Sequence, residues 1–262
     1  MRVRPERGGV TLSNWDPAPG SDGRHTALVW VQDFAGPAGL PPDAAIWTHE
    51  VGGGGWGDRQ RQIYTDDTGN AALDGAGHLA ITARRESDGV TITSARLTTK
   101  DHFAVRYGRV EACMKVPGGC GTWPAFWMLG TDIDQVGWPA CGEIDVMEHV
   151  GADPTRCYGT IHGPDYSGLQ GGIGSAVDSG IDLSEDFHRY AVAWEESGVA
   201  WILDGREHHR ITPSDVPGPW PFDHDFYLLV NLAIGGDWRG NDTEPELPTS
   251  LLIDWIRVDE VG

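Results

Sequence analysis

The chain has 262 residues, of which 39 are acidic and 19 are lysine or arginine, and its formal net charge is −20 at pH 7. A surface this acidic repels phosphate backbones and anionic lipid headgroups, which argues against nucleic acid or membrane partners. The apolar stretches are too short to span a bilayer, and the first ten residues, MRVRPERGGV, show no apolar segment of a signal peptide.

The first 25 residues predict a loose arm, and residues 26–262 predict a single domain. Within this domain apolar residues recur with a period of two, which is typical of β-strands. Many strands without helical crossovers predict an all-β fold, an antiparallel sandwich. In chain order the predicted strands are residues 78–85, 89–97, 107–116, 189–196, 199–205, 226–234 and 251–260.

Tight turns are predicted between the later strands. The dipeptides Ser197–Gly198 and Asp204–Gly205 lie between apolar segments and predict two successive hairpin turns. One short turn of helix is expected to open at Thr212, because Pro213 suits a first helical position. No convincing amphipathic helix is visible in the pattern.

Tryptophan and cysteine are both informative. Twelve tryptophans exceed what a core of this size needs, and the surplus indicates aromatic surfaces for stacking on a ligand, although many will also fill the core. The cysteines show no CxxC spacing, so a metal role is not indicated. Two disulfides in any of three connectivities, or four buried thiols, both remain open. The cysteines are Cys113, Cys120, Cys141 and Cys157.

The segment GEIDVMEHVG, residues 142–151, places three carboxylates in an apolar strand. Glu143 and Asp145 share one face by alternation, whereas Glu148 falls on the opposite face. Buried acids are costly without partners, so the cluster needs a reason. An acidic edge strand fits poorly because its neighbours are apolar, and a metal cluster that includes His149 is another alternative.

The interpretation we favour is a pair of glycosidase carboxylates. Retaining enzymes hold a nucleophile and an acid/base roughly 5–5.5 Å apart. A β-bulge at Val146–Met147 would shift the alternation and bring all three acids to one face. Asp145 would then share a proton with Glu143, the nucleophile, while negative charge nearby would raise the pKa of Glu148, the acid/base.

Five segments together resemble the laminarinase-type endo-β-1,3-glucanases of glycoside hydrolase family 16. The resemblance covers roughly residues 28–260, and its E-x-D-x-x-E motif is the bulged variant of the family. It implies a concanavalin A-like β-jelly-roll with a concave substrate cleft, and a double-displacement mechanism with the three roles given above. The segments are YGRVEACMKVPGG, GTWPAFWMLG, QVGWPACGEIDVMEHVG, TIHGPDYSG and VNLAIGGDWRGN.

The resemblance implies a secreted, monomeric enzyme that cleaves internal β-1,3 bonds of glucans such as laminarin and curdlan. Rival interpretations are the same fold acting on mixed-linkage glucan or a galactan, and a non-catalytic β-glucan-binding protein. A sugar cleft needs aromatic platforms and hydrogen-bonding groups. The candidates for contacts with substrate are Trp123, Trp127, Trp138, His162, Asn231 and Arg106.

The sequence departs from the family pattern at two places, one expected to bind substrate and one expected to bind a structural calcium ion. Asp58–Arg59–Gln60 replaces the usual Asn-Asn-Glu at positions expected to contact glucose on the non-reducing side. Asp33 stands where glutamate is common, near a structural calcium that many relatives carry. Asp254 is expected on the inward face of its strand, with Leu252 and Ile256, where a carboxylate needs a cation or donors. Asp33, Asp254 and a carbonyl near Gly77 are the calcium candidates, with an arginine partner or backbone hydrogen bonds as the alternatives.

Overall fold

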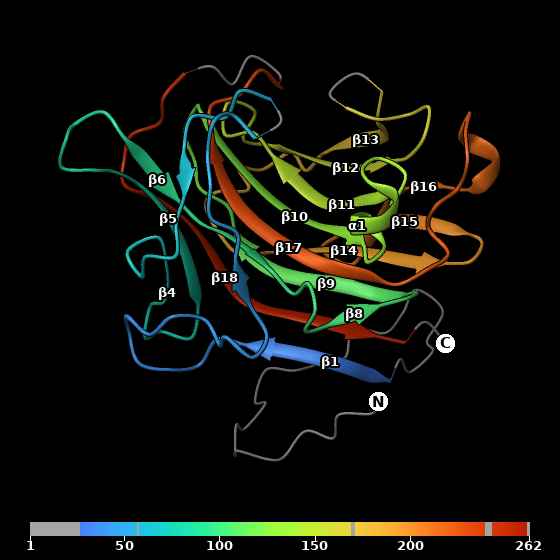
Figure 1. The fold of residues 1–262 in the computed structure, drawn as a ribbon, viewed down its shortest axis with the longest axis horizontal. Coiled ribbons are helices and arrows are strands. Elements are labelled where there is room, and N and C mark those ends of the chain that lie inside the picture. The colour runs from blue at the N-terminus through green and yellow to red at the C-terminus, as the bar shows by residue number, and fades with distance from the viewer. Residues whose placement is uncertain (1–26, 57, 169–170, 239–242, 261–262) are drawn as a thin grey trace.

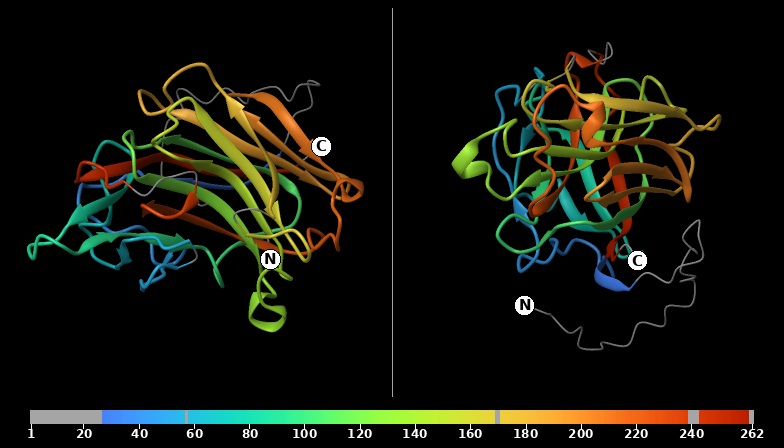
Figure 2. Two further views of the ribbon diagram at one scale, coloured as in Figure 1. Left: turned by 90° about the horizontal axis from the view of Figure 1, so that it is seen from above. Right: turned by 90° about the vertical axis from the view of Figure 1, so that its right-hand side faces the viewer.

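The computed structural model describes residues 27–56, 58–168, 171–238 and 243–260. The arm predicted over residues 1–25 lies outside these ranges. Two curved sheets pack face to face with almost no helix, as Figures 1 and 2 show. All the strand pairs are antiparallel except the short pair β3–β6. The predicted all-β jelly-roll sandwich is therefore confirmed.

One sheet has ten strands and forms the convex side of the sandwich. Its central neighbours β14, β9, β18 and β5 come from distant parts of the chain, as expected when each segment alternates between two sheets. The strands, in spatial order, are β16 (Arg206–Ile211), β15 (Gly198–Leu203), β14 (His188–Glu195), β9 (Gly108–Lys115), β18 (Thr249–Asp259), β5 (Leu79–Arg85), β6 (Ile92–Ser94) and β3 (Ile63–Tyr64), with β1 (Leu28–Asp33) beside β18 and β4 (Ala71–Leu73) beside β5.

The other sheet has eight strands and carries the concave face. Its centre is β17, in which every residue is buried, paired to β10 along its whole length. The strands, in spatial order, are β13 (Ile173–Asp178), β12 (Arg156–His162), β11 (Glu143–His149), β10 (Thr122–Gly130), β17 (Phe226–Ile234), β7 (Arg96–Thr98) and β2 (Thr48–His49), with β8 (Ala104–Val105) beside β17.

The core lies between the two sheets and is built from alternate residues of each strand. Phe126 and Met128 of β10 point into it, while Trp127 between them points to the concave face. This is the alternation that a two-layer β-fold requires, because successive side chains on a strand face opposite sides. Each strand of the concave sheet thus contributes one set of residues to stability and the other to the cleft.

Most predicted strands are found within one or two residues of their expected ends, and 226–234 matches β17 throughout. The segment 89–97 was wrong as one strand, because the chain crosses from one sheet to the other at Ala95, between β6 and β7. The turn at Asp204–Gly205 is confirmed, with positive φ at both residues. The turn predicted at Ser197–Gly198 was wrong by one residue. Glu195 pairs with Gly198, so the turn residues are Glu196 and Ser197.

The short helical elements match the expectation of few helices. A 3₁₀ turn, η1 (Pro213–Asp215), follows Thr212, whose side chain and that of Asp215 form a capping box. The other helix described is α1 (Ile133–Val136), on the loop before β11. None of the described helices is long and apolar enough to cross a membrane. The four cysteines are unpaired; Cys120 is exposed and the other three are buried.

The inward face predicted for β18 was wrong because this strand contains a bulge of its own. Ile253 pairs with Met114 and Trp255 with Cys113, so Asp254 is an extra residue in the ladder. The core residues of the strand are Leu251, Ile253, Ile256 and Val258, which change parity across the bulge. Leu252 and Asp254 are therefore half-buried and do not belong to the core.

Candidate active site

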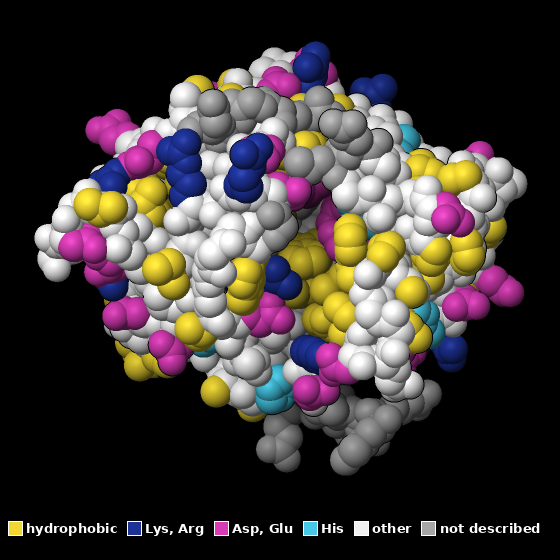
Figure 3. Space-filling model, turned by 45° about the horizontal axis from the view of Figure 1, so that its top comes forward, with side chains coloured by type: hydrophobic (Ala, Val, Ile, Leu, Met, Phe, Trp, Pro, Cys, Tyr) yellow, Lys and Arg dark blue, Asp and Glu magenta, His cyan; other side chains and the backbone are white. Residues whose placement is uncertain are grey.

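A cleft of about 1230 Å³ runs across the concave sheet. Figure 3 shows it as a hollow whose walls carry apolar and acidic side chains. The strands β10, β11, β12 and β17 form its floor, and loops before β3 and β11 form its sides. A groove of this length and mixed chemistry suits a chain of sugar rings, which have apolar faces and polar edges.

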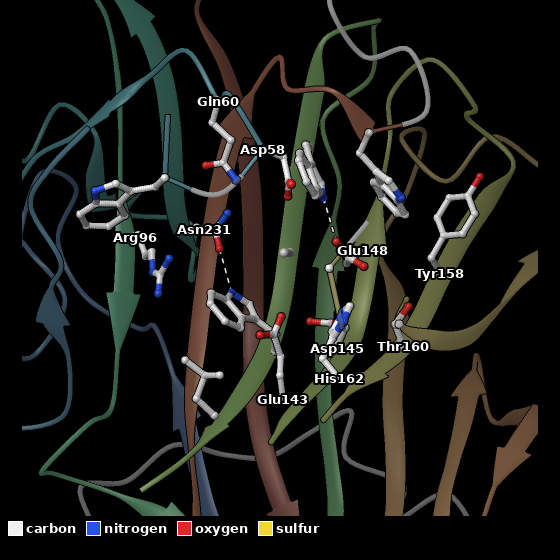
Figure 4. A pocket seen from close by; sticks show the side chains of 18 of the residues that line it. Asp58, Gln60, Arg96, Glu143, Asp145, Glu148, Tyr158, Thr160, His162 and Asn231 are labelled. Atoms are coloured by element: carbon white, nitrogen blue, oxygen red, sulfur yellow. Dashed lines mark hydrogen bonds and ion pairs between the residues drawn. The ribbon is translucent and has the colours of Figure 1, made fainter. Parts of the chain in front are cut away.

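The predicted bulge lies in the floor of this cleft. Asp145 pairs with Thr160 and Glu148 with Tyr158, so Val146 and Met147 together oppose Gly159. The same shift interrupts the pairing with β10. Glu143, Asp145 and Glu148 all line the cleft, as Figure 4 shows. The bulge predicted at Val146–Met147 is confirmed.

Each of the three acids has a partner in the cleft. The indole N–H of Trp138 donates to Glu143 Oε2 at 2.6 Å, and that of Trp123 donates to Glu148 Oε1 at 3.0 Å. His162 Nε2 lies 3.2 Å from Asp145 Oδ2. The two outer glutamates are thus held by aromatic donors and the central aspartate by an imidazole, so the side chains are oriented before substrate arrives.

Burial raises the pKa of all three acids. For Glu143 and Glu148, the negative charge of Asp145 raises the pKa further, and the pKa of Glu143 reaches about 8. Burial raises the pKa of Asp145 to about 7, and a hydrogen bond with Glu143 partly offsets this effect. At neutral pH the cluster therefore retains protons, as an acid/base catalyst requires.

The structure brings five of the six predicted substrate residues into the cleft, and Arg106 is the exception. Arg106 is exposed before β9, where its guanidinium faces Asp225 and the carbonyl of Asp223. A strand-end arginine satisfied by surface acids explains it fully. Of the tryptophans, Trp138 is 48% exposed and offers a free face, whereas Trp123 stacks on Trp238 at 5.2 Å.

Asn231 illustrates how a polar residue fits an apolar strand. Its Oδ1 accepts a hydrogen bond from Trp127 Nε1 at 2.8 Å, and its Nδ2 donates to Tyr64 Oη at 3.2 Å. Both partners belong to the protein, so a sugar hydroxyl is not needed to satisfy the amide. Asn231 therefore fixes the Trp127 ring at the floor of the cleft.

Several cleft residues were not expected from the sequence. The Arg96 guanidinium lies between two indole rings, 4.6 Å from the centroid of Trp127 and 5.3 Å from that of Trp56. No spacing in the sequence connects these three positions, because β7, β10 and the loop before β3 come together only in the folded chain. Further lining residues that sequence patterns did not identify are Glu50, Tyr158, Thr160 and Trp238.

The residues of the unusual Asp58–Arg59–Gln60 segment point in different directions. Asp58 and Gln60 line the cleft, and Arg59 turns outward to pair with Asp237. Burial and the charge of Asp237 raise the pKa of Asp58. Gln60 Oε1 already accepts hydrogen bonds from Gln62 and Tyr64. Of these three residues, Asp58 and Gln60 line the cleft where a sugar would bind, and Arg59 does not.

The residues proposed for metal binding are also located. His149 is wrong as a partner of the three acids, since it is buried on the far side of β11 and bonds the carbonyl of Arg156. The described cluster of metal-ligating groups is instead Glu143, Asp145 and His162. On the convex side, Asp33 pairs in register with Trp255, next to Asp254.

Asp254 is half-buried in β18. Burial raises the pKa of this carboxyl, while the imidazole of His78 and the thiol of Cys113 partly offset the effect. Gly77 precedes His78 in the chain, so all three calcium candidates lie near the bulge of β18. Among the interactions of the described residues, no arginine or lysine pairs with Asp254.

Comparisons with known proteins agree with this geometry. The chain is 39% identical to a beta-glucanase from Rhodothermus marinus over 89% of its length and 85% of that protein, and 36% identical to a glucan endo-1,3-beta-glucosidase from Cryptopygus antarcticus over 82% and 84%. The laminarinase catalytic domain from Thermotoga maritima superposes with a TM-score of 0.82 at 40% identity, covering 91% of this chain and all of that one. The model of glycosyl hydrolases family 16 matches residues 58–257, and this chain is a member of that family.

Proposed function

We propose that this protein is a retaining endo-β-1,3-glucanase that cleaves internal bonds of laminarin-like glucans. The observation that carries the proposal is the bulge of β11, which aligns Glu143, Asp145 and Glu148 on the floor of an open cleft. An open groove admits the middle of a polymer chain, which favours internal cleavage. The relatives named above, a beta-glucanase, an endo-1,3-beta-glucosidase and a laminarinase, support the choice of linkage.

In the first step Glu143 attacks the anomeric carbon and forms a glycosyl–enzyme ester, while Glu148 gives its proton to the departing glycosidic oxygen. Glu148 suits this role because burial and the charge of Asp145 keep its pKa raised. Glu143 must be ionised to attack, and the Trp138 N–H stabilises that form. Asp145, bonded to Glu143 and next to His162, takes up the proton that Glu143 releases.

In the second step the ionised Glu148 removes a proton from water, and the resulting hydroxide displaces Glu143 from the anomeric carbon. Two inversions at that carbon give net retention. Asp145 returns its proton toward Glu143 when the ester breaks, which restores the starting state. Trp138, half-exposed beside Glu143, offers a face against which the sugar ring at the reaction centre can stack.

The test is to incubate the protein with laminarin, curdlan, mixed-linkage β-glucan and an algal galactan, and to size the products. We expect short β-1,3-oligosaccharides from laminarin with a rapid fall in polymer length. Cleavage only of mixed-linkage glucan or galactan would replace the proposed substrate. Binding without cleavage of any polymer would show a glucan-binding protein instead.

We further propose that the protein acts outside the cell as a monomer, with the polysaccharide as its partner. Polymeric glucans do not cross a membrane, so their hydrolase has to meet them outside. The net charge of −20 favours dispersal in solution over binding to nucleic acid or acidic lipid. Detection in culture medium, and light scattering of the purified protein, test the two statements.

We also propose a structural calcium ion near the bulge of β18, held by Asp254 and Asp33 with the carbonyl of Gly77. Calcium prefers carboxylate and carbonyl oxygens, and a half-buried carboxyl that pairs with no described arginine or lysine gains from a cation. The support is the raised pKa of Asp254 and the register of Asp33 beside it. The ion would stabilise this edge of the fold and take no part in hydrolysis.

A further inference from the structure

The bulge that aligns the catalytic acids is contacted from below by the opposite sheet. Trp201 of β15 is fully buried, and its indole N–H donates to the backbone carbonyl of Asp145 at 2.7 Å. Asp145 is the last residue of β11 in regular register before the shift. A side chain of the convex sheet thus forms a hydrogen bond with the catalytic strand at the point where its ladder is interrupted.

This contact depends on a residue without a side chain. Gly159 lies opposite the bulge, and its neighbours Cys157 and Ile161 point into the core. A Cβ at Gly159 would lie 2.0 Å from Trp201 Cδ1 and 2.3 Å from Nε1, far inside contact distance. The indole therefore passes through space that only glycine leaves open on β12.

The Trp201 ring also packs against its cross-strand neighbour, His209. The imidazole of His209 on β16 stacks on it with centroids 4.3 Å apart and planes 5° from parallel. Burial lowers the pKa of His209 to about 4, so the ring that stacks is neutral. The imidazole also has a hydrogen bond with the backbone of Gly159, so His209 and Gly159 together restrict the rotation of the indole.

We infer that Trp201 is a positioning residue for hydrolysis, whose N–H, admitted by Gly159, holds the bulge in the register that turns Glu148 toward Glu143. The inference rests on the proposed function, because it concerns the same carboxylates. Trp201 touches no substrate and acts through the backbone. A bulge leaves ladder groups without their regular partners, so a donor at this carbonyl favours the bulged strand over a slipped one.

The test compares Trp201→Phe with Trp194→Phe. Trp194 is an ideal control, because it is also fully buried in the core and donates its N–H to a backbone carbonyl, that of Phe222 at 3.1 Å. Both changes remove one buried hydrogen bond and similar volume, so their effects on melting temperature should be alike. Only the first removes a hydrogen bond to β11.

We expect Trp201→Phe to lower kcat on laminarin roughly ten- to a hundredfold with KM little changed, since small misplacements of reacting groups have effects of this order. Trp194→Phe should keep kcat within about twofold of wild type, because no reacting group moves. Equal kcat values in the two variants, at matched stability, would overturn the inference. An inactive wild type would instead contradict the proposed function.

A second pair of variants covers the case in which Trp201→Phe does not fold. His209→Ala removes the stacked ring at the outer strand β16, together with its bonds to His208 and to the backbone of Gly159, and should give a smaller fall in kcat, again at constant KM. Gly159→Ala displaces the indole directly. If this substitution acts through the Trp201 hydrogen bond, the double variant Gly159→Ala with Trp201→Phe should have a kcat no lower than that of the slower of the two single variants. Unchanged kcat in His209→Ala, or additive losses in the double variant, would contradict a positioning role.

Discussion

The bulges of β11 and β18 each lie beside an acid, and they differ in how readily the sequence reveals them. In β11 the extra residue lies between Asp145 and Glu148, and in β18 it is Asp254 itself. The first strand has acids on both parities of an apolar segment, so a regular strand would bury one of them without a partner. The second has a single acid, which an unbroken alternation accommodates without conflict.

The two bulges also place their carboxylates differently. In β11 three acids face one cleft, where burial raises the pKa of each and the charge of Asp145 raises the pKa of Glu143 and Glu148 further. In β18 the acid faces the convex side, half-exposed, with an imidazole and a thiol nearby. The three acids of β11 lower the stability of the fold but serve catalysis, whereas the acid of β18 affects stability alone. Alternation in the sequence therefore predicts which face of a strand a residue lies on only where every bulge is revealed by an acid that a regular strand would bury.

The largest expected effect is the loss of hydrolysis when the nucleophile is removed. Glu143→Gln keeps the shape of the side chain but cannot form the glycosyl ester, so no turnover of laminarin should be detectable. Calorimetry with a laminari-oligosaccharide should still show binding close to that of the wild type, since the aromatic surfaces remain. Asp254→Asn is the matched control and should hydrolyse normally. Turnover in Glu143→Gln would contradict the assignment of roles.

A deletion series tests whether the bulge of β11 acts only through side-chain parity. Removing Met147 leaves a regular strand in which all three acids still share one face, so reduced but measurable hydrolysis is expected. Removing Val146 and Met147 together turns Glu148 toward the core and should abolish activity. Thermal unfolding must show that both variants fold. Equal activity in the two would mean that parity does not govern the site.

A moderate effect concerns stability and pH in β11. Between the ordinary glutamate pKa of 4.5 and about 8, the unfolded chain ionises while folded Glu143 keeps its proton, so the free energy of unfolding falls as pH rises. Glu143→Gln removes this cost and should raise the melting temperature at pH 7.5 by a few degrees, where each kcal/mol is roughly 2–4 °C. Near pH 4 the gain should vanish. Scanning calorimetry at both values checks the sign.

The smallest effect is expected at β18. If calcium binds there, a chelator should lower the melting temperature of the wild type by a few degrees and leave that of Asp254→Asn unchanged. Without an ion, the raised pKa of Asp254 means that the amide would stabilise the fold at neutral pH, and the chelator would change nothing. Elemental analysis of the purified protein distinguishes these outcomes. Activity should be the same in both proteins.

The strands and the catalytic segment could be predicted well because their signals are local. The period of two in residues 226–234 and the three acids of GEIDVMEHVG are each visible within ten residues. Arg96 could not be predicted, because its place between Trp56 and Trp127 depends on segments that only the sheet brings together. Arg106 failed for the converse reason, since a surface acid on a distant loop satisfies it.

The sequence by itself determined the all-β class, the identity of the acids and the need for an interruption in β11, because alternation and charge burial act between near neighbours. Tertiary structure alone decided the inward face of β18, the partners of Asn231 and the support of the catalytic strand by Trp201. These depend on which side chains the two sheets bring together across the core. That pairing is a property of the packed sandwich, and no local spacing encodes it.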